Sequence, residues 1–160
     1  MNITKATPAD IPQIMQLLQK RIDWMDDMGL YQWNKTHYLD CYPASYFEEK
    51  IRGELVLVAR EGSDLTAVMA LFSHDPRWED DGVTAYYVHH LATDPQYPGL
   101  GRAMLDYAEQ YARAGGCQAL RLDSQLVNEK LSRYYEALGY QPAGQCVDGE
   151  YVGILREKFL

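Results

Sequence analysis

The chain has 160 residues, of which 47% are hydrophobic and 24% charged, proportions typical of a globular domain. Its 15 basic and 23 acidic residues give a net charge of −8, which argues against a nucleic-acid partner because phosphate binding needs clustered Lys and Arg. The longest apolar runs, 55–59 and 67–72, are far shorter than the roughly 20 residues that span a bilayer. No membrane partner is therefore expected.

Cysteine usage and the N-terminal segment indicate the compartment. Cys41, Cys117 and Cys146 form neither a CxxC pair nor a spacing typical of a metal site, so we expect reduced thiols and no metal. The N-terminal residues lack the basic region and apolar run of a signal peptide. We therefore expect a cytoplasmic protein and, because no repeat or long linker is present, one domain over residues 1–160.

The first half of the chain predicts helices and a hairpin. Apolar residues recur at helical spacing between Ile11 and Met25, Thr7-Pro8 is suited to the helix start, and Gly29 to its end. A Gly-containing turn between two β-rich runs is typical of a hairpin. The predicted elements are, in order, a strand at 2–6, a helix from 7 to 29, an irregular aromatic segment at 30–42, a helix at 43–51, and strands at 54–60 and 65–73.

The second half alternates strands with helices. A charged loop leads to the third long run, and Gly115-Gly116 and Gly139 are natural ends for two amphipathic helices. A hairpin followed by strand–helix–strand–helix–strand predicts an α/β (α+β) fold with a mixed sheet and helices on its faces. The predicted elements are a strand at 83–93, a helix from 99, a strand at 119–123, a helix at 128–138, and strands at 140–145 and 151–158.

The junction between the strand at 83–93 and the next helix predicts an anion site. A helix N-terminus exposes unpaired N–H groups and the positive end of the helix dipole. Two glycines, Gly99 and Gly101, let the backbone approach a phosphate closely. A dinucleotide fingerprint is excluded because Met104 stands where its last glycine is needed, and no segment fits a Walker loop. What remains is a Q-x-x-G-x-G run from Gln96 to Gly101.

This run resembles the acyl-CoA loop of the GNAT superfamily of N-acetyltransferases. The later segment NEKLSRYYEALGY, from Asn128, resembles a second motif of that family, and the two occur in the family's order. The resemblance covers nearly the whole chain. It implies a GNAT-like mixed, largely antiparallel sheet of about six to seven strands flanked by about four helices.

The resemblance also implies a binding site for acetyl-CoA. The strand HHLATDP is similar to the family strand whose backbone pairs with the pantetheine arm, and Asn128 is implied to contact that arm as well as capping its helix. The loop departs from the family pattern at two positions. Pro98 has no backbone N–H to donate to a phosphate, and Gln96 stands where the family often has a basic residue. The implied cofactor-binding residues are Leu91, Ala92, Thr93, Gln96, Gly99, Leu100, Gly101, Arg102, Ala103, Asn128 and Tyr135.

The candidate acid and base follow from the chemistry of amine acetylation. An alkylamine has a pKa of about 10.4, so a base is useful at neutral pH, and an acid can protonate the departing thiolate. Tyr135 stands at the tyrosine of the family motif and is the expected acid, with Tyr134 as the alternative. Strand alternation sends His89 and His90 to opposite faces, and a resemblance to serotonin N-acetyltransferase favours His89 as the base. Asp123 is a further candidate base.

Residues 24–46 are expected to determine acceptor specificity, since in the family the first helices cover the acceptor side. Trp24, Tyr31 and Trp33 are the candidate substrate-binding residues, because aromatic faces near carboxylates hold cations; they equally suit anchoring of an irregular loop. The sequence thus predicts direct acetyl transfer from acetyl-CoA to the primary amine of a small molecule or peptide, in a ternary complex and with a homodimer expected by analogy. The alternative function is a non-catalytic acyl-CoA-binding sensor.

Overall fold

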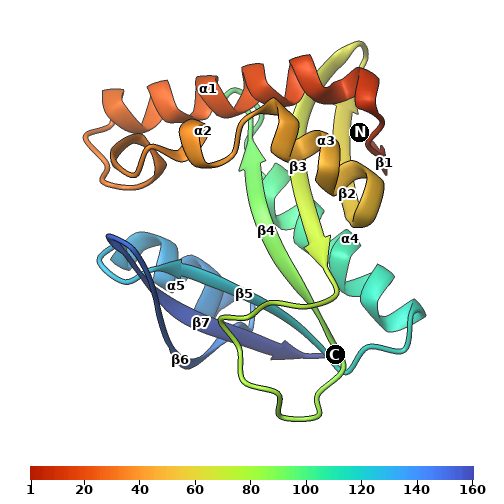
Figure 1. The fold of residues 1–160 in the computed structure, drawn as a ribbon, viewed down its shortest axis with the longest axis vertical. Coiled ribbons are helices and arrows are strands. Elements are labelled where there is room, and N and C mark those ends of the chain that lie inside the picture. Colours follow the sequence, from red (N-terminus) through yellow and green to blue (C-terminus); the bar gives the residue numbers. More distant parts are fainter. The chain divides into compact units, whose positions relative to one another are not determined.

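The structure is a computed structural model that describes residues 1–160. It contains seven strands, five α-helices and two short 3₁₀ helices (Figure 1). The elements are β1 (Asn2–Lys5), η1 (Pro8–Asp10), α1 (Ile11–Asp27), η2 (Trp33–Lys35), α2 (Tyr38–Cys41), α3 (Ala44–Gly53), β2 (Leu55–Glu61), β3 (Asp64–Phe72), β4 (Ala85–Thr93), α4 (Leu100–Ala114), β5 (Ala119–Gln125), α5 (Glu129–Ala137), β6 (Gln141–Asp148) and β7 (Tyr151–Phe159).

The strands follow the hydrogen-bonded order β1-β2-β3-β4-β5-β7-β6. The pairs β1–β2, β2–β3, β5–β7 and β6–β7 are antiparallel, and β4 pairs with β5 in parallel over Ala85–Tyr87. A mixed, largely antiparallel sheet was predicted, and it is confirmed. The helix count is one above the predicted four because α2, a single turn, lies inside the segment expected to be irregular.

The residues group into two compact units, and each is described by itself. The first comprises Met1–Leu71 and His89–Tyr107, and the second comprises Phe72–Val88 and Ala108–Leu160. The strand β4 and the helix α4 each contribute residues to both units. The expectation of one domain over 1–160 stays a prediction.

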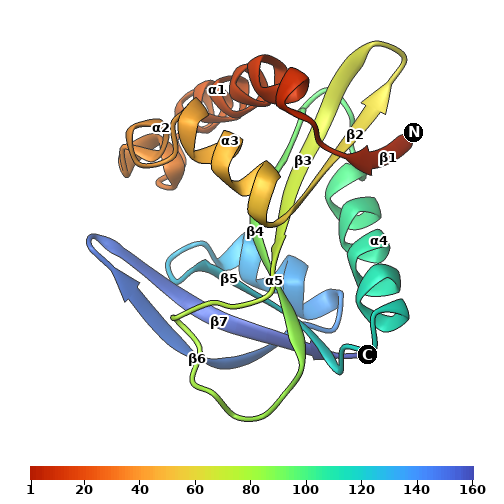
Figure 2. The same cartoon turned by 45° about the vertical axis from the view of Figure 1, so that its right-hand side comes forward.

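The core of the first unit forms around the β2–β3 hairpin. Its two-residue turn contains Gly62 at φ +60, the left-handed conformation that such hairpin turns need. Every residue of β3 after Asp64 is buried, as expected of a strand covered on both faces. Figure 2 shows α1 and α3 on one side of the hairpin and the beginning of α4 on the other. The apolar stripe of α1 that faces this core consists of Ile14, Leu17, Leu18 and Met25.

The second unit is built on β5, β7 and β6, with α5 in contact with β5 (Figure 1). Asn128 caps α5 as predicted, since its side chain accepts a hydrogen bond from the Leu131 N–H at 3.0 Å. The guanidinium of Arg121, 1% exposed, is held by Glu157 and Asp81 and lies 4.4 Å from the centre of the Trp78 ring. These contacts anchor the 73–84 segment to β5. None of the helices in either unit is long and apolar enough to cross a membrane.

Candidate active site

The glycine turn of the first unit has the geometry of an anion site. Gly99 adopts φ +87 directly before α4, and a Cβ built there meets no atom within 4 Å. The glycine is therefore required by its backbone conformation, and the space beside it is open. Helix geometry leaves the N–H groups of Leu100, Gly101 and Arg102 without intrahelical acceptors. The N–H of Ala103 donates to the Gly99 carbonyl at 3.2 Å, so Ala103 completes the helix and offers no backbone donor to a ligand.

The side chain of Asp94 fixes the turn that leads to these glycines. Its carboxylate accepts hydrogen bonds from the Gln96 N–H at 2.9 Å and from Lys20 at 2.7 Å. Its own N–H donates to the Thr66 carbonyl at 2.8 Å, which joins the turn to β3. The Gln96 backbone is thus engaged, and Gln96 can reach a ligand only through its exposed side chain. Sequence reasoning missed Asp94, although an Asp at the first position of a turn is a usable signal.

Arg102 and the residues of β4 complete the loop predicted to bind cofactor. Arg102 is exposed and makes a long i,i+4 contact with Asp106, 3.7 Å apart, an interaction weak enough to be exchanged for a phosphate. Leu91 and Thr93 are half-buried and Ala92 is buried. The β4 residues and the loop residues lie in the first unit, whereas Asn128 and Tyr135 belong to the second unit.

A cage of aromatic residues surrounds His90 in the first unit, next to the predicted base His89. His90 is 9% exposed, and its two ring nitrogens bond to the hydroxyls of Tyr38 and, at 2.8 Å, of Tyr46. The rings of Tyr42 and Phe47 lie 4.6 and 5.4 Å from the imidazole, centroid to centroid. We name these four aromatic residues the tyrosine cage. Sequence reasoning missed its role because its members are 43 to 52 residues away from His90.

The backbone at His90 departs from the alternation predicted for β4. His90 adopts φ +54, so the strand is not regularly extended at this residue. The prediction that His89 and His90 point to opposite faces assumed an extended backbone throughout. His89 itself is half-buried on β4, and its ring centroid lies 6.0 Å from that of His90.

The aromatic segment predicted to bind the acceptor encloses a hollow in the first unit. Its volume is about 420 Å³, and it is lined by Gln19 and Ile22 of α1 and by 33–35 and 37–40. Trp33 lines the hollow and stacks on Tyr38, with ring centroids 4.3 Å apart. Trp24 and Tyr31 do not line it: Trp24 packs under the Arg21 guanidinium, and Tyr31 is 55% exposed. Of the three candidates, only Trp33 reaches this hollow.

In the second unit, Tyr135 of α5 is buried next to a charged cluster. Burial raises the pKa of Tyr135, with smaller contributions from Tyr134 and Asp123. Its hydroxyl therefore stays protonated at neutral pH, as an acid must. Tyr134 lies beside it but is 37% exposed.

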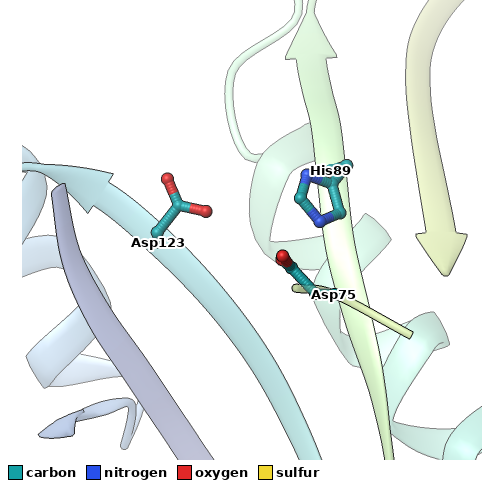
Figure 3. A group of neighbouring side chains, drawn as sticks. All are labelled: Asp75, His89 and Asp123. Atoms are coloured by element: carbon teal, nitrogen blue, oxygen red, sulfur yellow. The ribbon is translucent and has the colours of Figure 1, made fainter. Parts of the chain in front are cut away.

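Asp123, the further candidate base, is already engaged by two donors. Its carboxylate accepts from Arg77 at 3.1 Å and from the Tyr151 hydroxyl at 2.5 Å. Figure 3 shows Asp123 on β5, Asp75 on the segment after β3, and His89 on β4. One oxygen each of Asp75 and Asp123 lie within 4.8 Å of one another. The guanidinium of Arg77 donates to Asp123, whereas the backbone N–H of Arg77 donates to Asp75 at 2.9 Å.

The comparisons with known proteins decide the family. The model of the acetyltransferase (GNAT) family matches residues 18–140. The chain belongs to this family. A curated relative, the uncharacterized N-acetyltransferase YesJ of Bacillus subtilis (strain 168), is 26% identical over 151 residues, which cover 89% of this chain and 83% of that protein.

Solved structures agree with the assignment to the GNAT fold. A GNAT-family acetyltransferase from Listeria monocytogenes 4b F2365 matches with a TM-score of 0.80 and 25% identity, over 99% of this chain and 94% of that one. The PaiA N-acetyltransferase from Thermoplasma acidophilum, solved in complex with coenzyme A, matches with a TM-score of 0.78 and 18% identity, over 99% and 98%. The predicted superfamily, fold and enzyme class are thereby confirmed.

Proposed function

We propose that this GNAT protein transfers the acetyl group of acetyl-CoA to the primary amine of a small molecule or peptide, by direct transfer in a ternary complex. The observation that carries the proposal is the turn at Gly99, whose positive φ presents the N-terminus of α4 to an anion. The structural neighbour solved with coenzyme A supports the choice of ligand.

The residues of the turn fit a pyrophosphate. The N–H groups of Leu100, Gly101 and Arg102 would donate to its oxygens, and the Arg102 side chain would add charge. Pro98 contributes no donor, and the Gln96 side chain can supply an amide N–H in its place. Acetyl-CoA bound there supplies an activated thioester, and the remaining chemistry belongs to the protein's side chains.

Tyr135 is proposed to stabilise the departing thiolate. A thiol with a pKa of about 8.5 is a stronger acid than a tyrosine whose pKa is raised by burial. Full transfer of the proton from Tyr135 to sulfur is therefore uphill. The hydroxyl instead donates a hydrogen bond that strengthens as negative charge develops on sulfur, which is how a fixed donor lowers a barrier.

The cysteines support direct transfer over an acyl-enzyme route. Burial raises the pKa of the Cys117 and Cys146 thiols, which lowers the thiolate fraction that a nucleophile needs. Cys41 is exposed and lies in the aromatic segment at the end of α2. The sequence suggested His89, half-buried on β4, as one candidate for the base. Trp33 is the proposed acceptor contact.

The decisive experiment separates an enzyme from an acyl-CoA sensor. Binding of acetyl-CoA is measured by calorimetry, and release of the CoA thiol is followed with a linear diamine, an aromatic ethylamine, an amino-acid amide and a peptide with a free N-terminus. Acetylated product identified by mass spectrometry supports the proposal. Tight binding without thiol release on any amine favours the sensor.

A further inference from the structure

We propose that Tyr46 and His90 form a proton relay that deprotonates the acceptor amine, with Tyr46 as the group that meets the amine. The relay rests on the proposed N-acetyltransferase function and assigns the base within it. His90 acts through Tyr46 and is a positioning residue in this scheme. His90 and all four residues of the tyrosine cage lie within the first unit.

The backbone of His90 is held in an unfavourable conformation. A non-glycine residue at φ +54 inside a strand persists only where its surroundings determine it, and such residues cluster at functional sites. Three elements provide those surroundings: β4 carries His90, α2 carries Tyr38, and α3 carries Tyr46 and Phe47. The strain and the packing together fix the direction of both imidazole nitrogens.

The hydrogen bonds of the imidazole define which end can take a proton. Neutral imidazole has one N–H donor and one acceptor nitrogen. Tyr38, at the Nδ1 end, is buried, and burial raises the pKa of its hydroxyl, so Tyr38 stays neutral. Tyr46, at the Nε2 end, is half-exposed. Because the relay needs an acceptor nitrogen at the half-exposed Tyr46, its competent tautomer donates Nδ1–H to the Tyr38 oxygen and accepts the Tyr46 O–H at Nε2.

Proton transfer through this tautomer is balanced. The ammonium group of the acceptor gives one proton to the Tyr46 oxygen, while the Tyr46 hydroxyl proton moves to Nε2 of His90. The products are a neutral amine, a neutral Tyr46 and an imidazolium whose two N–H groups donate to Tyr38 and Tyr46. The amine nitrogen then has the lone pair that attacks the thioester.

The groups around the imidazole permit this change of charge. Three tyrosines present hydroxyl-bearing rings: Tyr38 of α2, Tyr42 directly after α2, and Tyr46 of α3. His89 contributes the second imidazole of β4. The ammonium of Lys50 lies 5.5 Å from the centre of the Tyr46 ring and opposes a positive charge at His90. The proton is therefore held briefly and released once the amine has reacted.

The test uses the full chain with Tyr46→Phe, and with Tyr42→Phe as the matched control. Tyr42 packs against the same imidazole, but both nitrogens are already bonded by Tyr38 and Tyr46. The rate of thiol release at saturating acetyl-CoA is measured from pH 6 to 10, using whichever amine of the panel the wild type acetylates. His90→Gln and His89→Gln are measured in parallel, with circular dichroism to check folding.

We expect Tyr46→Phe to lower kcat/KM for the amine by about 100-fold near pH 7, the scale of general-base catalysis. The defect should shrink as the pH approaches about 10.4, because the amine then arrives already neutral. A merely structural role gives a defect that is independent of pH. His90→Gln should reproduce the same pH dependence, and His89→Gln should not.

Three results would overturn the relay. If Tyr46→Phe has the same rate as Tyr42→Phe at every pH, Tyr46 takes no part in deprotonating the amine. If the pH-dependent defect occurs only in His89→Gln, the base is His89. Absence of turnover by the wild type on every amine overturns the proposed function, and the relay with it. If His90→Gln fails to fold, Tyr46→Phe against Tyr42→Phe still decides the question.

Discussion

At the scale of the residue, the hydroxyl of Tyr135 donates the proposed hydrogen bond to the departing thiolate. It is 9% exposed, and burial keeps it protonated at neutral pH by raising its pKa. Tyr135→Phe removes the hydrogen bond to the departing thiolate while keeping the ring. We predict that kcat falls by about 100-fold at pH 7, the scale of losing one hydrogen-bond donor to developing negative charge. Thiol-release kinetics at saturating acetyl-CoA and amine provide the measurement.

Tyr134→Phe is the matched comparison for Tyr135→Phe. The two residues are adjacent on α5, and their ring centroids lie 5.4 Å apart. Calorimetry should give the same Kd for acetyl-CoA in both variants, since neither loses a group proposed to hold phosphate. A larger loss of kcat in Tyr134→Phe would transfer the acid function to Tyr134.

The residues that contact Asp123 in the second unit decide how this candidate base is interpreted. Asp123 ends a strand and carries a carboxylate, so sequence alone admits it as a base. The structure surrounds it with Arg77 and Tyr151, and Arg77 also binds Asp148 at 2.8 Å. Burial alone would lower the pKa of Arg77, but the neighbouring carboxylates outweigh it and raise that pKa. The carboxylate of Asp123 is therefore part of an ion-pair network.

At the scale of the element, α4 depends on glycines at both of its ends. Gly99 precedes it at φ +87, and Gly116 follows it at φ +78. An alanine at either position carries a backbone strain of about 1–2 kcal/mol. We predict that Gly99→Ala raises the Kd for acetyl-CoA by about tenfold, the factor that corresponds to about 1.4 kcal/mol. The loop must shift to relieve the strain, which moves the N–H donors of the first turn.

Gly116→Ala separates strain from binding in this experiment. A Cβ at either glycine meets no atom within 4 Å, so neither alanine disturbs the packing. The two variants differ in which end of α4 carries the substitution. Both should lower the urea midpoint of unfolding by a similar amount, and only Gly99→Ala should weaken acetyl-CoA in calorimetry. Equal Kd values for acetyl-CoA in the two variants would show that Gly99 does not belong to the cofactor site.

Sequence predicted the elements whose determinants are local. The helical spacing of α1, the turn of the β2–β3 hairpin and the cap of α5 each depend on a few neighbouring residues, and all three were predicted. The helix α2 was missed because one turn is too short to give a periodic signal.

The tyrosine cage was missed for a different reason. Tyr38 and Tyr46 are separated from His90 by 52 and 44 residues, and no local pattern brings them together. The left-handed backbone of His90 also has no signature in the residue type alone. The family motifs indicate a turn at Gly99 and a helix that carries Tyr135, and the roles of both residues stay predictions. The part of the candidate site that depends on tertiary packing could not be predicted.

At the scale of the whole molecule, buried tyrosines set the stability at alkaline pH. Burial raises the pKa of Tyr38, Tyr135 and Tyr151 in the folded protein, and Asp123 contributes to the rise at Tyr151. In the unfolded chain the same hydroxyls ionise at about pH 10. The folded state therefore holds these protons more tightly, so stability is intact below pH 10 and is lost as the pH rises above it.

The free energy of unfolding should fall above pH 10 by about 1.4 kcal/mol per pH unit for each of these tyrosines. Urea midpoints at pH 9, 10 and 11 measure the slope, and phenolate absorbance at 295 nm should rise together with the loss of ellipticity. Tyr151→Phe removes one of the three groups and should reduce the slope by about a third. Ionisation of all the tyrosines before unfolding, or a slope unchanged in Tyr151→Phe, would show that burial does not hold these protons.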